Sequence, residues 1–173
     1  MARIAVALAG GQNVVAFLDM IAASEIDAYT LAHSDDGYNV LVGSHGPEER
    51  NGVQISPDVR LFGNYASHPN ILNPELNSTA AGRYQALHWV ADAYIKSLNL
   101  SDFGPVSQDL IAIQQIRERH AIPLIQAGQI TLAIAACSNI WASLPGNGYG
   151  QRQNQISMLT AAYKAAGGTI AVA

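Results

Sequence analysis

A single cysteine, Cys137, occurs among the 173 residues of this chain. One cysteine excludes an internal disulfide and has no partner for a thiolate metal site. Its neighbours Ala135 and Ala136 are small and apolar, so we expect the thiol to be a buried apolar side chain. The histidines show no HxxxH or similar ligand spacing, so the sequence predicts no metal site.

Charge is also scarce. Only 13% of the residues are Asp, Glu, Lys or Arg, and the formal net charge is −4. The basic residues are dispersed and form no stripe that could neutralise phosphates, which argues against a nucleic-acid partner. No glycine-rich phosphate loop follows a predicted strand, and no serine lies in a GxSxG elbow. The sequence therefore gives no support to a nucleotide-dependent enzyme.

Long hydrophobic runs are missing as well. The N-terminal apolar run is shorter than a signal-peptide core and lacks a convincing cleavage site. If this run were joined to residues 14–24, Gln12, Asn13 and Asp19 would all enter the bilayer. We therefore expect a soluble protein made in the cytoplasm, with no stable membrane association.

The chain does contain enough apolar residues for a core. Hydrophobic residues make up 49% of it, and a chain of this length buries about 70% of its unfolded surface. We predict a single domain over residues 1–173, in which residues 1–12 form an extension. Disorder is excluded by the same composition.

Hydrophobic periodicity predicts an α+β fold, with several helices and a small antiparallel sheet. A first helix starts at Val14, and alternation within 37–66 indicates two strands joined by a long polar connection. The other predicted helices run from Ser78 or Thr79 to about residue 98, over about 106–119, as short turns within 123–142, and over about 151–166. The last of these is expected to end at Gly167-Gly168.

Glu25 interrupts the pattern of the first helix. On a helical wheel Phe17, Leu18 and Ile21 lie within roughly 60° of Val14, and Glu25 falls about 20° from it, inside the apolar stripe. A carboxyl group among apolar neighbours has a raised pKa, which suits a general acid for glycosidic cleavage. A glutamate at a helix end paired with an arginine or a backbone amide is the alternative.

Hydrolytic glycosidases normally use a second carboxylate. Asp27, Asp35 and Asp36 are the nearby candidates, all in the loop that leads to the first predicted strand. Acidic residues in a polar loop are also explained by simple solvation. Both interpretations stay open at this point.

Several segments closely resemble the phage-lambda-type endolysin family, over most of residues 14–170. In chain order they are AFLDMIAASE, GYNVLVG, the HP pair at 68–69, LNPELNSTAAGRYQ, SQDLIAIQQIRERHAIPLI and CSNIWASLPGNGYGQ. The resemblance implies a compact lysozyme-like fold and a peptidoglycan lytic transglycosylase that needs no cofactor. It also implies that Glu25 is the catalytic acid and then the base.

In such a reaction the glutamate protonates the oxygen between N-acetylmuramic acid and N-acetylglucosamine. It then removes the proton from the muramoyl 6-hydroxyl as that oxygen attacks the anomeric carbon. The product is a 1,6-anhydromuramoyl end, and no second enzyme carboxylate is needed. The resemblance further implies host lysis by a monomer that waits in the host cytoplasm until a holin gives it access to the wall.

The resemblance also implies a set of substrate-binding residues. Tyr84 and Gln85 stand in the GRYQ segment, and Tyr149, Gly150 and Gln151 stand in the GYGQ segment. Tyr84 has an equally good explanation as a core residue, because it begins the apolar stripe of its predicted helix. The Gln85 amide suits acetamido and hydroxyl groups, and the Tyr149 ring can stack on a sugar.

The chain departs from the family at two places. Relatives have Gly-Thr after the catalytic glutamate, whereas Ile26 and Asp27 follow Glu25 here, so we expect altered local geometry and rate. The connection over residues 44–58 is longer than expected and is predicted to form a lip over the cleft. Trp141 is expected to be buried.

Two other readings remain. A water-using muramidase, helped by Asp35 or Asp36, would leave reducing ends rather than anhydro ends. A glycan-binding module without activity, conceivable because of Ile26, would bind wall material and create no new chain ends.

Overall fold

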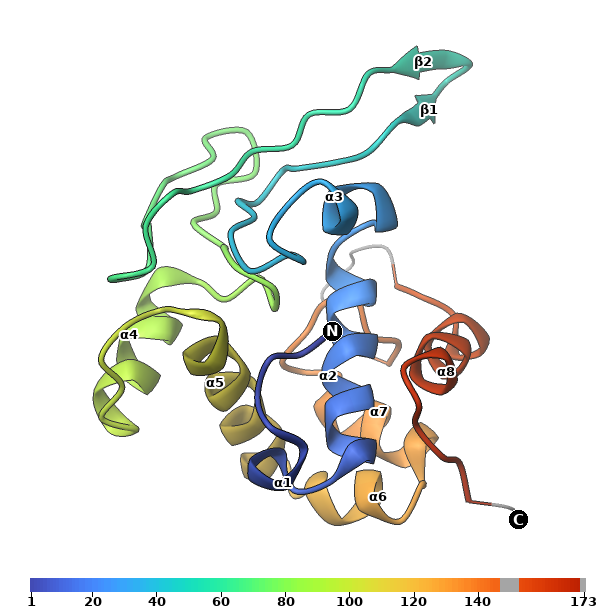
Figure 1. Ribbon diagram of the computed structural model, residues 1–173. Helices are drawn as coiled ribbons and strands as arrows, with labels where there is room; N and C mark the ends of the chain where they lie inside the picture. Colours follow the sequence, from blue (N-terminus) through green and yellow to red (C-terminus); the bar gives the residue numbers. More distant parts are fainter. Residues whose placement is uncertain (147–152, 172–173) are drawn as a thin grey trace. The chain divides into compact units, whose positions relative to one another are not determined.

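The computed structural model describes residues 1–146 and 153–171. Their helices are α1 (Val6–Ala9), α2 (Gln12–Glu25), α3 (Ala28–Ala32), α4 (His88–Ser97), α5 (Pro105–Glu118), α6 (Ile122–Gln126), α7 (Ile130–Cys137) and α8 (Ile156–Ala165), and their strands are β1 (Glu48–Arg50) and β2 (Val53–Ile55) (Figure 1). This mixture confirms the predicted α+β class. Internal contacts divide the chain into a first unit, Met1–Glu25 with Ala112–Ala173, and a second unit, Ile26–Ile111. The prediction of one domain over residues 1–173 stays a prediction.

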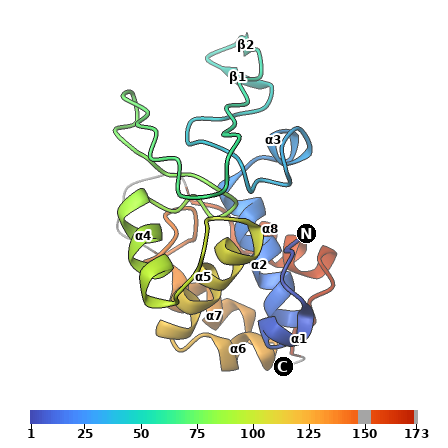
Figure 2. The same ribbon diagram turned by 60° about the vertical axis from the view of Figure 1, so that its left-hand side comes forward.

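Helix α2 is the centre of the first unit. It contacts α1, α6 and α8, and Figures 1 and 2 both show α8 beside it. The residues of α2 from Val14 to Ala22 are all apolar except Asp19, and such a segment is expected to be buried on nearly every side. The fully or nearly fully buried residues of α2 are Val14, Val15, Ala16, Phe17, Leu18, Met20, Ile21 and Ala22. The predicted first helix is therefore confirmed. The segment predicted as an extension contains α1, which packs on α2.

The C-terminal end of α8 is fixed by two glycines, as predicted. Gly167 adopts a left-handed φ of 87°, and the Gly168 N–H donates to the Tyr163 carbonyl at 3.0 Å. The chain then turns back, and the Thr169 N–H and hydroxyl both donate to Asn13 Oδ1 at 3.0 Å. These bonds hold the end of the chain against the start of α2.

The sheet of the second unit is not where it was predicted. Its two strands, β1 and β2, lie inside the segment predicted to be a loop, and they pair Glu48 with Ile55 and Arg50 with Val53. Asn51 and Gly52 form the turn with φ values of 52° and 77°, the two positive angles of a type I′ turn. The Asn-Gly dipeptide was the signal that the prediction overlooked.

The two segments that were predicted as strands do face each other. Val40 forms an antiparallel bridge with Leu61, and the Leu41 N–H donates to the Arg60 carbonyl at 2.9 Å. Only isolated bridges form, because Gly43, with a φ of 88°, turns the chain out of the extended region after a few residues. The predicted pairing is correct, and the predicted continuous strands are wrong.

Helix α4 begins about nine residues later than predicted. The stretch before it holds Gly82 and Gln85 at positive φ, and Ala81 pairs with Ala86 across a tight turn. A helix cannot run through such angles. Thr79, one of the two predicted caps, still reaches α4, because its hydroxyl oxygen accepts the His88 N–H at 3.3 Å. Helix α5, in contrast, starts at Pro105 and matches its prediction within one residue.

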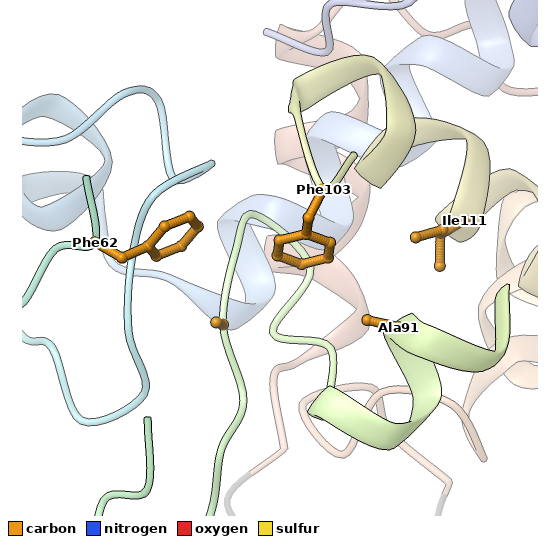
Figure 3. Close-up of a cluster of buried hydrophobic side chains, with 5 residues drawn as sticks. Phe62, Ala91, Phe103 and Ile111 are labelled. Atoms are coloured by element: carbon orange, nitrogen blue, oxygen red, sulfur yellow. The ribbon is translucent and has the colours of Figure 1, made fainter. Parts of the chain in front are cut away.

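The core of the second unit is a small aromatic and aliphatic cluster. Figure 3 shows Phe62, Phe103, Ala91 and Ile111, which lie on loops, α4 and α5. The Phe62 and Phe103 ring centroids are 6.3 Å apart. Burial of these side chains stabilises the second unit.

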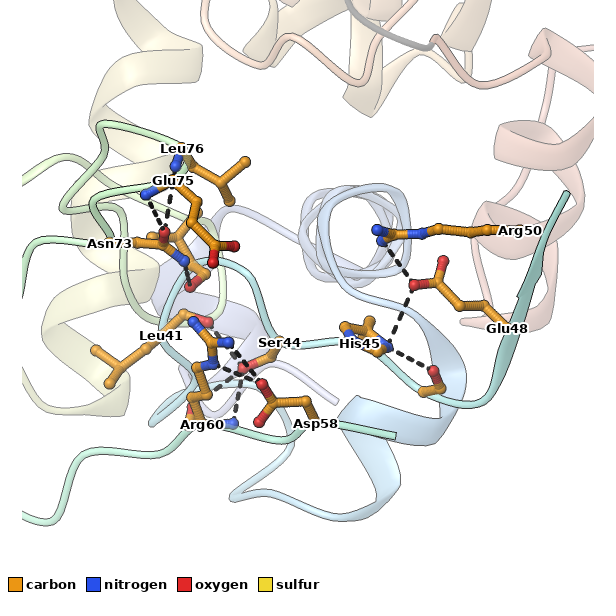
Figure 4. A network of polar contacts seen from close by, with 12 residues as sticks. Leu41, Ser44, His45, Glu48, Arg50, Asp58, Arg60, Asn73, Glu75 and Leu76 are labelled. Carbon is orange, nitrogen blue, oxygen red and sulfur yellow. Dashed lines mark hydrogen bonds and ion pairs between the residues drawn. The ribbon is translucent and has the colours of Figure 1, made fainter. Parts of the chain in front are cut away.

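Polar contacts fix the base of the 44–58 segment. The His45 and Asp58 backbones exchange two hydrogen bonds of 2.9 Å. The Arg60 N–H donates to the Ser44 hydroxyl oxygen at 2.9 Å (Figure 4). Asn73 braces the adjoining loop through a 3.2 Å bond from its amide to the Val42 carbonyl. The hairpin therefore projects from an anchored base.

Candidate active site

Glu25 is the last residue of α2, so its side chain leaves the apolar helix where the buried stripe ends. Its carboxylate oxygen Oε1 lies 2.5 Å from the Ser143 hydroxyl oxygen, and an ionised Glu25 accepts a hydrogen bond from that hydroxyl. The backbone of Ser143 also hydrogen-bonds to the carboxyl group. In the described part of the chain, Glu25 is thus partnered by the hydroxyl and the backbone of Ser143. Of the two partners considered from the sequence, the structure shows the backbone group and not the arginine.

Burial dominates the electrostatics of Glu25. Desolvation raises the pKa of its carboxyl group, and the hydrogen bonds from the Ser143 side chain and backbone lower it by a smaller amount. The net effect is a raised pKa, as the helical wheel predicted. A carboxyl group of this kind keeps its proton to higher pH than a surface glutamate and can act as a general acid.

Buried residues on either side of Ser143 in the sequence hold its segment in place. Trp141 and Leu144 flank it and are buried, which confirms the prediction for Trp141. Asn154 then joins the Ser143 segment to the end of α2, because its N–H donates to the Ser143 carbonyl at 2.8 Å and its amide donates to the Ser24 carbonyl at 3.1 Å. Neither Ser143 nor Asn154 was singled out from the sequence.

Ile26 occupies the position of the family glycine without a glycine-like backbone. It does not adopt a positive φ, and it is 95% buried. Its Cδ1 comes within 3.0 Å of where a Cβ on Gly37 would lie. The isoleucine therefore fills a space in its own unit, and the expected effect on rate stays a prediction.

Asp27 has a structural role at the start of α3. Its carboxylate accepts the Thr30 N–H at 3.0 Å, the Thr30 hydroxyl at 2.6 Å and the Gly46 N–H at 3.1 Å. Desolvation raises the pKa of this carboxyl group, but the hydrogen bonds from Thr30, Gly46 and Tyr29 outweigh it and lower the pKa overall. Asp27 is a helix cap that stays ionised.

The other two acidic candidates also have partners in the second unit. Asp35 accepts the Tyr65 hydroxyl at 2.7 Å. Asp36 forms an ion pair with Arg83, whose guanidinium nitrogen is 2.9 Å away. Each carboxylate is thus explained by a local contact.

Tyr84 is buried, and its hydroxyl donates to Asp109 Oδ1 at 2.6 Å. The Tyr38 hydroxyl donates to the same oxygen at 2.8 Å, so two tyrosines share one buried aspartate. Burial and the nearby negative charge hold the pKa of Tyr84 well above its ordinary value. These contacts agree with the core interpretation of Tyr84, although the side chain lies outside any helix. Asp109 was not found from the sequence.

Of the remaining predicted binding residues, only Gln85 lies in the described part of the chain. Gln85 is half-buried and donates from its amide to the Gly82 carbonyl at 2.9 Å. Tyr149, Gly150 and Gln151 lie outside the described residues. A role in substrate binding stays a prediction for Tyr84, Gln85 and these three.

Within 1–146 and 153–171, no three His, Cys, Asp or Glu side chains are grouped as a metal site would require. None of the helices in those ranges combines the length and apolar character needed to cross a membrane. Cys137 is fully buried, as expected, and burial raises the pKa of its thiol to about 12.

Known structures show the class to which this architecture belongs. A structure of bacteriophage lambda lysozyme complexed with a chitohexasaccharide matches with a TM-score of 0.80 and 46% identity, over 99% of this chain and all of that one. A second structure of lysozyme from bacteriophage lambda matches with a TM-score of 0.74 and 44% identity over the same shares. The fold is therefore that of lambda-type lysozyme, as the resemblance predicted.

Sequence comparisons agree. The endolysin of Escherichia phage lambda is 48% identical over 159 residues, which cover 90% of this chain and 91% of that protein. The endolysin of Escherichia phage P2 is 44% identical over 165 residues, covering 91% and 94%. The family model described as Endolysin matches residues 15–170. The chain belongs to the endolysin family, phage enzymes of the glycosidase type that degrade peptidoglycan.

Proposed function

We propose that this endolysin is a lytic transglycosylase that cleaves the bond between N-acetylmuramic acid and N-acetylglucosamine. The observation that carries the proposal is the desolvated Glu25 carboxyl group with a serine hydroxyl as its partner. The local contacts of Asp27, Asp35 and Asp36 support it, because each of the three has a structural partner. A reaction that needs only one enzyme carboxyl group fits these residues better than one that needs two.

The reaction begins with protonated Glu25. Its proton passes to the bridging oxygen, and the bond from that oxygen to the muramoyl anomeric carbon breaks. The ionised carboxylate then accepts the proton of the muramoyl 6-hydroxyl while the 6-oxygen bonds to the anomeric carbon. Glu25 ends protonated, no water is consumed, and the product carries a 1,6-anhydro ring.

The substrate is the glycan strand of peptidoglycan. The lambda lysozyme structure is of a complex with a chitohexasaccharide, and this supports an extended glycan site in the present chain. We also propose that the protein acts as a monomer and waits in the host cytoplasm until a holin opens the way to the wall. Tyr84, Gln85, Tyr149, Gly150 and Gln151 are the proposed substrate contacts.

The test is the chemistry of the chain ends. Purified peptidoglycan is digested with the unmodified protein and with Glu25→Gln, and the muropeptides are measured by mass spectrometry. We expect products about 18 Da lighter than their reducing counterparts, released only by the unmodified protein.

Glu118→Gln is the matched control, because it makes the same change on an exposed residue at the end of α5. It should release the same products as the unmodified protein. Reducing ends would instead show that water is the nucleophile, and release of products by Glu25→Gln would remove Glu25 from the mechanism. Binding to the wall without any release would identify a glycan-binding module.

The 44–58 segment is proposed to control access to the glycan site. Replacing the hairpin, residues 48–55, with a short glycine-rich turn would leave its anchored base in place. We expect a changed KM for polymeric peptidoglycan and little change for a short fragment. Equal kinetic constants on both substrates would dispose of the idea.

A further inference from the structure

A chain of three short contacts leads away from the Glu25 carboxyl group, all within the first unit. Glu25 Oε1 lies 2.5 Å from the Ser143 hydroxyl oxygen. That oxygen lies 2.9 Å from the Ser24 hydroxyl oxygen, which in turn lies 2.7 Å from the Ile21 carbonyl oxygen. Each distance is that of a hydrogen bond, so each contact needs one hydrogen.

The two serines supply only two hydrogens for these three contacts. The direction of the chain can be assigned from its far end, because the Ile21 carbonyl oxygen can only accept. Ser24 must therefore donate to Ile21, and it can only accept from Ser143. Ser143 then has no hydrogen left for Glu25, and the hydrogen of the first contact has to come from the carboxyl group itself.

We propose that Ser24 and Ser143 are positioning residues that hold Glu25 in its protonated form at rest. Ser143 accepts the hydrogen bond of the Glu25 carboxyl group and donates to Ser24, and Ser24 donates to the Ile21 carbonyl. When Glu25 gives its proton to the substrate, Ser143 turns its own hydrogen toward Oε1 and stabilises the carboxylate until it acts as a base. Each serine keeps its hydrogen throughout. The inference rests on the proposed acid and base roles of Glu25.

The surroundings of Glu25 leave this chain as its main polar contact. Among the described elements packed on α2, helices α1 and α6 carry no ionisable side chain, and α8 carries Tyr163 and Lys164. Neither of these is among the causes of the shifted pKa of Glu25, which are burial and Ser143 alone. A change in either serine should therefore be visible in the titration of Glu25.

The two serines should act in opposite directions. Ser24→Ala leaves the Ser143 hydrogen without its acceptor when Glu25 is protonated, so it disfavours the protonated form. Ser143→Ala removes both the acceptor of the protonated form and the hydroxyl donor of the ionised form. The hydrogen bond to the charged carboxylate is the stronger of the two, so its loss decides the direction and the variant disfavours the carboxylate. The Glu25 titration should move to lower pH in the first variant and to higher pH in the second.

The experiment is a ¹³C titration of the glutamate side-chain carboxyls in the full chain, with the Glu25 signal assigned by its loss in Glu25→Gln. It is combined with the pH dependence of kcat/KM for peptidoglycan cleavage. The alkaline limb should move in the same direction as the titration, and kcat should fall about tenfold in Ser143→Ala with little change in KM. Ser143→Thr keeps a hydroxyl and should restore the midpoint of the unmodified protein.

Ser138→Ala is the matched control, because the Ser138 hydroxyl also donates to a carbonyl three residues earlier, Ala135, at 2.9 Å. It should change neither titration nor rate. In the double variant the midpoint should follow Ser143→Ala alone, because Ser24 acts only through Ser143.

We call the hydrogen-bonded chain through Ser143 and Ser24 the relay. It would be overturned if the Glu25 titration midpoints of the two serine variants moved in the same direction, or if they stayed unchanged while activity fell. The NMR titration reads Glu25 directly and needs no turnover. If the relay holds and the products carry reducing ends, the proposed transglycosylase reaction fails while the role of the serines stands. If anhydro ends appear and the midpoints do not separate, the reaction stands and the relay fails.

Discussion

Gly168 shows how closely single residues of the first unit are packed. A Cβ added there would lie 2.3 Å from the Tyr163 ring, well inside any real contact distance. The ring is fully buried and its hydroxyl donates to the Thr169 carbonyl at 3.2 Å, so it cannot move aside. Glycine is required at position 168 because there is no room for a Cβ atom, and not because of its φ angle.

We expect Gly168→Ala to lower the free energy of unfolding by about 2 kcal/mol, because it overpacks this contact. Gly63→Ala is the control, since a Cβ at Gly63 meets no atom within 4 Å and its φ is not positive. That variant should unfold at the same denaturant concentration as the unmodified protein or slightly above it. Equal midpoints for both variants in urea would contradict the packing argument.

At the scale of elements, helix α3 depends on its cap. It has only five residues, too few for helix propensity to hold it, and Asp27 satisfies its first turn and also binds the Gly46 N–H. The same side chain therefore connects α3 to the beginning of the 44–58 segment.

Asp27→Ala should lower the free energy of unfolding by about 1 kcal/mol, the usual cost of losing a cap. Asp27→Asn should lose less, because asparagine also caps well. Neither substitution should abolish release of muropeptides, since Asp27 is explained as structural. Complete loss of activity in Asp27→Asn, with normal unfolding, would point instead to a catalytic carboxylate.

The elements also show which patterns could be read from the sequence. Helices α2 and α5 were predicted because their apolar spacing and flanking residues are local signals. Apolar spacing predicts a helix in the stretch before α4. In the structure the Gly82 N–H of this stretch donates to the Val40 carbonyl, and the backbone turns at Gly82 and Gln85. Spacing alone does not reveal such long-range bonds.

At the scale of the whole molecule, His68 makes stability depend on pH. Its Nε2–H donates to the Ala86 carbonyl at 3.0 Å, and its Nδ1 accepts the Asn70 N–H at 3.1 Å, so the folded protein needs the neutral ring. Burial lowers the pKa of His68, and the Ala86 hydrogen bond raises it by a smaller amount. His88 lowers it and Asp92 raises it by less still, and the net effect is a lowered pKa.

The direction in which stability changes with pH follows from the different proton uptake of the folded and unfolded states. The unfolded histidine takes up a proton near its ordinary pKa of 6.5, while the folded one resists until lower pH. The stability from His68 is therefore present above pH 6.5 and lost as the pH falls through the folded pKa. We expect urea unfolding to show this loss between pH 7 and 5, and His68→Gln to flatten it. His120→Asn, at an exposed position with a φ of 55°, should keep the full slope. The same slope in all three proteins would exclude His68 as its source.

The sequence by itself determined the class of fold, helices α2 and α5, and the glutamate that interrupts an apolar stripe. These follow from local chemistry, since apolar spacing marks a helix and a carboxyl group inside an apolar stripe has its pKa raised by burial. The family resemblance added the expected reaction, because its segments include both Glu25 and the stretch around Ser143.

Only the tertiary structure decided what surrounds that acid. Ser143 is 118 residues from Glu25 and Asn154 is 130 residues from Ser24, and no periodicity predicts that they meet. The same holds for Asp109, which receives two tyrosine hydroxyls from other parts of its unit. Hydrogen bonds between distant segments depend on how the chain packs, because many serines and asparagines look alike in sequence and only packing brings a particular pair within 3 Å.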